Sequence, residues 1–127
     1  ARGNFARAGL SGIIEQRVGR AVETLANLVA EKVAPFDVTF IDADKESMTE
    51  YFTLALELSR PGSLIIIDNV VRKGAVADAA STDTAVQGVR RFNQLLAREA
   101  RVSATTIQTV GSKGYDGFTL AFVTAGQ

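Results

Sequence analysis

Apolar side chains recur along the chain at a spacing of three or four residues in three separate stretches. The stretches are residues 21–34, 47–60 and 83–100, and each has polar residues between its apolar positions. This spacing places the apolar side chains on one face, so we predict three amphipathic helices. Pro35 ends the first helix, and the Pro61-Gly62 pair ends the second.

Shorter apolar runs, rich in β-branched and aromatic residues, alternate with these helices and predict strands. They cover residues 12–19, 36–43, 63–69, 102–110 and 117–125. The last two are separated only by residues 111–116, a connection that suits an antiparallel hairpin and not a parallel crossover. Before the first strand, residues 1–10 look like a helix end, with Gly9 as its cap.

The alternation of strands and helices predicts an α/β fold. Near-continuous apolar strands indicate a mostly parallel sheet covered by helices on both faces, with an antiparallel hairpin at the C-terminal end. Residues 71–82 are predicted to be a loop. The chain contains no linker or internal repeat, so we expect residues 1–127 to form a single domain.

Composition removes several classes of chemistry. The chain has no cysteine and no histidine, so a disulfide framework, a thiolate zinc site and a histidine base are all excluded within it. Acidic and basic residues balance at 14 each, which argues against nucleic acid or a membrane surface as a partner. No signal peptide is visible, and we expect a cytoplasmic protein.

Polar side chains follow two of the predicted strands at the point where each strand ends. Asp42 ends one strand, and Asp68 and Asn69 end the next along the chain. Ligands bind beyond the carboxyl ends of strands in open parallel sheets, so these oxygens would converge there if the two strands are neighbours. Such a set suits Mg²⁺, with Ca²⁺ or Mn²⁺ as alternatives. The competing interpretation is that an Asp at a strand end only caps the next helix, and for Asp44 we prefer it.

Lys45 follows Asp42 by three residues and is the second candidate at this edge. It is either a solvated lysine at a helix start, which is an unfavourable end for a cation, or a general base. In a chain without histidine, Lys45 is the best available base for removing a hydroxyl proton.

The motifs "PFDVTFIDADK", "RPGSLIIIDNVVRKG" and "GYDGFTLAFV" resemble the cation-dependent, S-adenosylmethionine-using O-methyltransferases. These are the relatives of caffeoyl-CoA and catechol O-methyltransferase, here of the bacterial type. "NFARAGL" and "RVGRAVETL" are similar to the same family just upstream. The resemblance covers essentially the whole chain and implies a Rossmann-like class I methyltransferase fold.

The resemblance also implies roles for individual residues. Asp42, Asp68 and Asn69 match the metal ligands, and Lys45 matches the proposed general base. The reaction implied is methyl transfer from S-adenosylmethionine to a hydroxyl of a catechol-like phenol.

Two further positions are implied on the cofactor side and two on the acceptor side. Ala21 matches the position whose backbone lies near the adenine, and Asp42 would approach the methionine end of the cofactor. Gly74 matches the glycine of the substrate-side loop. Lys73 stands where plant caffeoyl-CoA enzymes have a substrate-contacting Asn, so their acceptor is not implied here.

The family's first two strands, with the glycine-rich turn and the acid that grips the ribose, have no counterpart in this sequence. We therefore expect the carboxyl-terminal part of a longer protein, which alone binds S-adenosylmethionine poorly. Residues 12–19 would be cut off from residues 36–43 by two absent strands, leaving an unpaired edge. We expect a homodimer or larger species, or else a first strand that moves in beside residues 36–43.

The same motifs suggest three other functions. A non-catalytic module that binds a divalent cation or a partner stays open as the alternative. A nucleotide hydrolase is discounted because the chain has no phosphate-binding G-x-x-x-x-G-K-[ST] loop. A phospho-accepting receiver domain is discounted because its acidic pair and lysine are not placed correctly here.

Overall fold

The computed structural model describes residues 1–112 and 114–125, so Lys113 of the predicted hairpin connection lies outside the described residues. Helices and strands alternate as predicted over most of the chain. In chain order the elements are α1 (Arg2–Arg7), α2 (Ala21–Ala30), β1 (Val38–Ile41), α3 (Met48–Glu57), β2 (Leu64–Asp68), the 3-10 segment η1 (Arg72–Ala77), α4 (Thr84–Leu96), β3 (Val102–Gly111) and β4 (Gly114–Val123).

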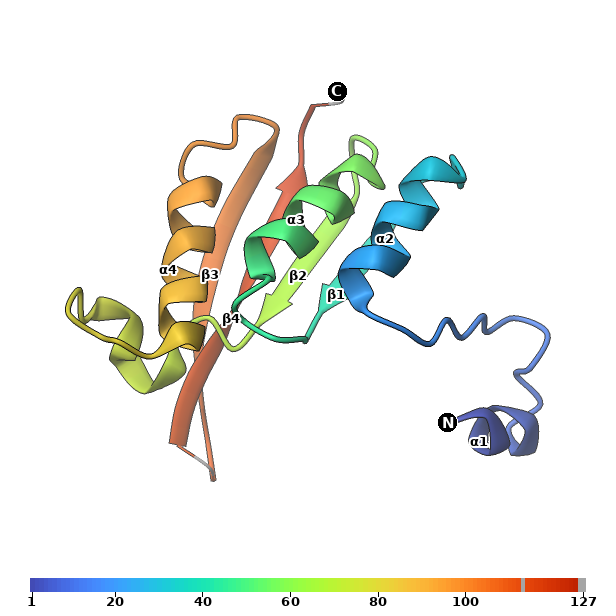
Figure 1. Ribbon diagram of the computed structural model, residues 1–127, viewed down its shortest axis with the longest axis horizontal. Helices are drawn as coiled ribbons and strands as arrows, with labels where there is room; N and C mark the ends of the chain where they lie inside the picture. Colours follow the sequence, from blue (N-terminus) through green and yellow to red (C-terminus); the bar gives the residue numbers. More distant parts are fainter. Residues whose placement is uncertain (113, 126–127) are drawn as a thin grey trace.

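The four strands form one sheet in the order β1-β2-β4-β3 (Figure 1). β1 pairs with β2 in parallel, while β4 is antiparallel to both β2 and β3. Three strands therefore point the same way and β4 alone runs against them. The sheet is thus mixed, with one parallel and two antiparallel pairs among the described strands, and the predicted C-terminal antiparallel hairpin is confirmed. The hairpin strands are longer than predicted and extend to Gly111 and from Gly114.

Helices α2, α3 and α4 all lie on one face of the sheet (Figure 1). On that face Ile65, Ile67 and Ala121 are fully buried. The opposite face keeps apolar side chains in solvent: Phe40 is 61% exposed and Phe122 is 48% exposed. Our expectation of helices on both faces is therefore wrong for the described residues, because the strands alternate between one covered and one uncovered side.

The core lies between the sheet and α3, the middle helix. Phe52 of α3 and Phe92 of α4 are fully buried and meet edge to face, with ring centroids 5.4 Å apart. This is a favourable geometry for two aromatic rings. The side chain of Asp83 accepts hydrogen bonds from the backbone N–H groups of Ala85 and Val86, so it caps the start of α4.

Residues 12–19 do not form the predicted strand. Within the described chain no strand lies beside them, so their backbone groups have no ladder to join, and Ile13 and Val18 are each 81% exposed. The segment crosses from α1 to α2 away from the sheet (Figure 1). It does not move in beside β1, which stays an edge strand.

The structure also describes the predicted cap at Gly9 and the predicted loop at residues 71–82. Gly9 follows α1 with φ +69°, as expected for a cap. The predicted loop at residues 71–82 begins with η1, a tight turn in which Lys73 and Gly74 have left-handed backbone angles. None of the helices found among residues 1–112 and 114–125 has the length and apolar character needed to cross a bilayer.

Candidate active site

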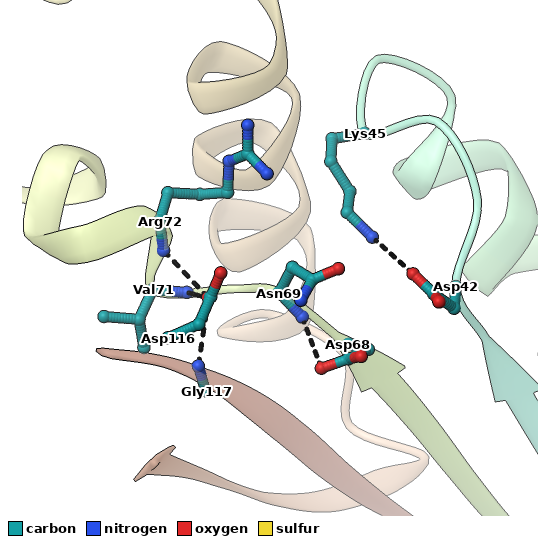
Figure 2. A network of polar contacts seen from close by, with 8 residues as sticks. All are labelled: Asp42, Lys45, Asp68, Asn69, Val71, Arg72, Asp116 and Gly117. Carbon is teal, nitrogen blue, oxygen red and sulfur yellow. Dashed lines mark hydrogen bonds and ion pairs between the residues drawn. The ribbon is translucent and has the colours of Figure 1, made fainter. Parts of the chain in front are cut away.

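The two predicted aspartates meet at the carboxyl ends of neighbouring parallel strands. Ile41 pairs with Ile67, so the next residues, Asp42 and Asp68, stand side by side at the edge of the sheet. Adjacent strands lie about 4.8 Å apart, which puts the two carboxylates within reach of a common ligand. Figure 2 shows both carboxylates at this edge, with Asn69 next to Asp68.

Asn69 is held by an unusual backbone conformation. Its φ is +59°, in the left-handed region that Asn tolerates better than most residues. Its backbone N–H donates to Oδ1 of Asp68 over 2.8 Å, which orients the carboxylate. The turn therefore directs Asp68 and Asn69 as a unit at the strand end.

Lys45 is buried and lies beside Asp42. Only 6% of the residue is exposed, and its Nζ is 3.4 Å from Oδ1 of Asp42 (Figure 2). The alternative of a solvated lysine is therefore wrong. The Asp42 side chain is itself 54% exposed, so the pair lies at the boundary between the interior and the strand-end opening.

The prediction that Asp44 caps the next helix is wrong: Ser47 is the N-cap of α3, and Asp44 instead closes the turn that precedes it. Its Oδ2 accepts a hydrogen bond of 3.1 Å from the backbone N–H of Ser47, and its Oδ1 accepts one from the hydroxyl of Tyr51. These hydrogen bonds, that of Ser47 first, lower the pKa of Asp44. Burial, followed by the same carboxylate, raises the pKa of Tyr51. Both oxygens of Asp44 are thus engaged in building the turn before α3.

Asp116 supports the candidate site structurally, a role that the sequence did not predict. Its Oδ1 accepts hydrogen bonds from the backbone N–H groups of Val71, Arg72 and Gly117, at 3.1, 3.0 and 2.9 Å (Figure 2). This single carboxylate oxygen, from a residue of β4, thereby fixes the backbone just after Asn69. The only available signal was the acid in "GYDG", a motif that marked the family but to which no role was assigned.

Gly74 and Tyr115 contact each other where the loop after β2 meets β4. Gly74 has φ +84°, and a Cβ atom there would lie 2.7 Å from the hydroxyl oxygen of Tyr115. That hydroxyl donates a hydrogen bond of 2.6 Å to the backbone carbonyl of Lys73. A glycine is thus required at position 74 both by the backbone angle and by the space.

Two of the cavities near the strand ends contain predicted metal ligands in their lining. One, of about 300 Å³, contains Ala21, Asp42 and Tyr51 in its lining, so the two predicted cofactor residues share one cavity. The other, of about 520 Å³, is lined by Asn69 and Lys73 together with residues of the β3–β4 hairpin. Gly74 is absent from that lining and acts through the loop geometry.

The donors at the strand ends fit a hard divalent cation. Asp42, Asp68 and Asn69 offer two carboxylates and an amide, the oxygen ligands that Mg²⁺ and Ca²⁺ prefer. The described residues contain no group of three or more His, Cys, Asp or Glu placed to hold a metal. A cation here would therefore depend on Asn69 and on water to complete its coordination, as is usual for Mg²⁺.

Several known proteins are similar to this chain. The family model described as O-methyltransferase matches residues 1–123. A catechol O-methyltransferase of Niastella koreensis is 54% identical over 123 residues, covering 97% of this chain and 56% of that protein. A catechol O-methyltransferase of Mycobacterium tuberculosis is 45% identical, covering 97% of this chain and 54% of that protein.

Two solved structures are similar over the same region. The O-methyltransferase TomG of Streptomyces achromogenes, in complex with S-adenosylmethionine, has a TM-score of 0.92 and 54% identity, with 97% of this chain and 55% of that chain covered. An O-methyltransferase of Bacillus cereus, bound to S-adenosylhomocysteine, has a TM-score of 0.92 and 56% identity, with 96% and 56% covered. The chain thus belongs to the O-methyltransferase family, has the fold of its S-adenosylmethionine-dependent members, and spans about half the length of these relatives.

Proposed function

We propose that the protein is an S-adenosylmethionine-dependent and divalent-cation-dependent O-methyltransferase that methylates a hydroxyl of a catechol-like phenol. The observation that carries this proposal is the buried Lys45, whose Nζ lies beside Asp42 at the strand end shared with Asp68. The names of the relatives support the reaction class, and the site chemistry supports the type of acceptor.

Asp42, Asp68 and Asn69 would hold the cation. A bound cation of this kind would lower the pKa of a hydroxyl that coordinates it, and an acceptor with two adjacent oxygens could coordinate it through both. The three side chains also fix where the acceptor's oxygens lie, at the open edge of the sheet. Positioning of two reactants in contact is a large part of the rate advantage in such a transfer.

Lys45 is the proton acceptor in this proposal. Its Nζ would take the proton of the acceptor hydroxyl through the nitrogen lone pair, and Asp42, 3.4 Å away, would stabilise the ammonium that forms. Burial of Lys45 keeps bulk water from competing for that position. The deprotonated oxygen is then left facing the cofactor side of the site.

Ala21, Asp42 and Tyr51 line the cavity that would receive the cofactor, which supplies the methyl group when bound. The larger cavity beside Asn69 would receive the acceptor, with Lys73 in its lining and Gly74 shaping the loop behind it. The reacting oxygen would then lie between the two cavities, next to Asp42 and Asn69.

Titration calorimetry with Mg²⁺, Ca²⁺ and Mn²⁺ on the full-length protein tests the proposal. We expect one site, whose occupation is required for methylation of a catechol and which is lost in Asp68→Ala. The matched control is Asp37→Ala, an exposed acid at the opposite end of β1 from Asp42. Cation binding that is unchanged in Asp68→Ala would contradict the metal assignment.

The alternative, a non-catalytic module for a cation or a partner, predicts a different result in the same experiment. Such a module would bind the cation without any coupling to S-adenosylmethionine, and catechol would not be methylated. Coupled binding and turnover favour the enzyme.

A further inference from the structure

The backbone of Lys45 is in contact with α4, the helix on the far side of α3 from α2. Gly88 of α4 is buried, and a Cβ atom there would lie 2.0 Å from the carbonyl oxygen of Lys45 and 2.9 Å from the backbone nitrogen of Glu46. No side chain fits in that space. The glycine therefore lets the turn that carries Lys45 press directly on the helix.

Two side chains of α4 hold the next residue of the same turn. Thr84 donates its hydroxyl to Oε1 of Glu46 over 2.7 Å, and the guanidinium of Arg91 donates to the carbonyl oxygen of Glu46 over 3.2 Å. The hydrogen bond from Thr84 also lowers the pKa of Glu46, so the carboxylate accepts it in its charged form. The turn thus contacts α4 at three positions along the helix: Thr84, Gly88 and Arg91.

The same helix also holds the substrate-side loop. The guanidinium of Arg90 donates a hydrogen bond of 2.6 Å to the carbonyl oxygen of Val76. The side-chain amide of Gln87 donates one of 2.5 Å to the carbonyl oxygen of Ser81. α4 therefore connects the turn that carries the base to the loop beside the acceptor cavity.

We propose that α4 is a positioning clamp for Lys45, with Gly88, Thr84 and Arg91 as positioning residues that touch neither substrate nor cofactor. The inference rests on the proposed role of Lys45. Because Lys45 Nζ reaches the strand ends from a turn fixed on α4, its distance to Asp42 depends on how closely that turn approaches the helix. A misplacement on the order of 1 Å at a catalytic group can cost roughly 10²-fold in rate.

The first test is Gly88→Ala in the full-length enzyme. We expect kcat to fall by up to roughly 10²-fold, while KM for the acceptor and the affinity for Mg²⁺ stay close to those of the wild type. In a Lys45→Ala background the same substitution should have no further effect on kcat. That non-additivity is the signature of action through Lys45, because a merely structural defect lowers kcat in both backgrounds.

A second set of variants keeps the test valid if Gly88→Ala does not fold. Thr84→Val combined with Arg91→Ala removes both donors to Glu46 from an exposed surface, and should lower kcat in the same direction by a smaller factor. Thr84→Ser, which keeps the hydroxyl, should restore its share. Gln94→Ala, at an exposed position of the same helix, is the matched control and should not change kcat.

The outcomes separate the clamp from the proposed function. Full activity in Gly88→Ala and in the Thr84/Arg91 variant, or equal losses with and without Lys45, would overturn the clamp while leaving the enzyme assignment intact. Full activity in Lys45→Ala would instead overturn the role of Lys45 in the proposed function, and the clamp with it.

Discussion

Lys45 places its amine where it has little contact with water and, among the described residues, one acidic neighbour within ion-pair distance. Burial of a charged group is costly unless it is paired, and the single contact with Asp42, at 3.4 Å, is a long one. A structural role would favour an apolar residue in that place. A role in proton transfer therefore accounts for a lysine at this position better than a contribution to the stability of the fold does.

Replacement of Lys45 should therefore separate activity from stability. We expect Lys45→Met in the full-length enzyme to lower kcat by roughly 10²-fold or more, the usual scale for a general base. The free energy of unfolding should stay equal or rise, because the half-exposed Asp42 keeps its solvation without a partner. Steady-state kinetics and urea unfolding measure the two effects.

Lys32→Met is the control for Lys45→Met, since Lys32 is exposed and lies outside the strand-end site. It should leave kcat unchanged. A Lys45→Met enzyme with normal kcat at neutral pH would show that Lys45 is not the base.

Asp116 offers a second residue-scale test. Asp116→Ala leaves the N–H groups of Val71, Arg72 and Gly117 without their acceptor, and we expect it to cost about 1–3 kcal/mol for each group that stays buried and unpaired. Because the freed segment follows Asn69, cation affinity should fall as well. Thermal unfolding and calorimetry measure the two effects, and Asp116→Asn, which keeps a carbonyl acceptor, should retain part of both.

At the scale of elements, the turns that follow β1 and β2 position the side chains of the candidate site. The turn between β1 and α3 carries Lys45, and the side chain of Asp44 closes it by accepting from Ser47 and Tyr51. The turn after β2 carries Asn69, and Asp116 closes it from β4. Each functional side chain is thus placed by a neighbouring acid that takes no part in the chemistry.

The hydrogen bonds that Asp44 accepts in this turn predict a specific pH dependence of stability. The folded-state pKa of Asp44 lies below its ordinary value of 3.8, because the charged carboxylate accepts these hydrogen bonds. The stabilisation is therefore fully present above about pH 5 and is lost as the pH falls through the folded-state pKa. Urea unfolding should show Asp44→Ala less stable than the wild type at pH 6, with the difference shrinking toward pH 3.

Tyr51→Phe provides the control for Asp44, since it removes one of the two donors and keeps the ring in the core. It should show a smaller pH-dependent loss than Asp44→Ala. A stability difference for Asp44→Ala that stays constant from pH 6 to pH 3 would contradict the assignment.

At the scale of the whole molecule, the sheet is half covered. Three helices cover one face, and on the other Val38, Phe40 and Phe122 are each 48–61% exposed. β1 is also an unpaired edge. Contiguous exposed apolar surface and open edges are both sites of association.

We therefore expect the 127-residue chain to form a homodimer or larger species, as measured by light scattering across a range of concentrations. Phe40→Ser combined with Phe122→Ser should shift the species toward the monomer, because the two changes reduce the exposed apolar area on the uncovered face. Leu10→Ser, at an exposed apolar position outside the sheet, is the control. A monomer at every concentration would show that this face and edge are tolerated in water.

The spacing of apolar residues was sufficient to predict those elements whose pattern lies entirely within one segment of the chain. The helices at residues 21–34, 47–60 and 83–100 exist where the spacing predicted them, although α2 ends at Ala30 because Lys32 takes a left-handed φ of +52°. The strand at residues 12–19 was wrong because strand pairing is a non-local property, and its partners are not among the described residues.

The same distinction applies to the site. The sequence alone determined that Asp42, Asp68 and Asn69 lie at strand ends, because polar residues at the end of apolar runs are a local feature. That the two strands are neighbours, that the backbone of Lys45 packs against Gly88, and that α2, α3 and α4 share one face were decided only by the tertiary structure. These properties depend on contacts between segments far apart in the chain, which no local spacing records.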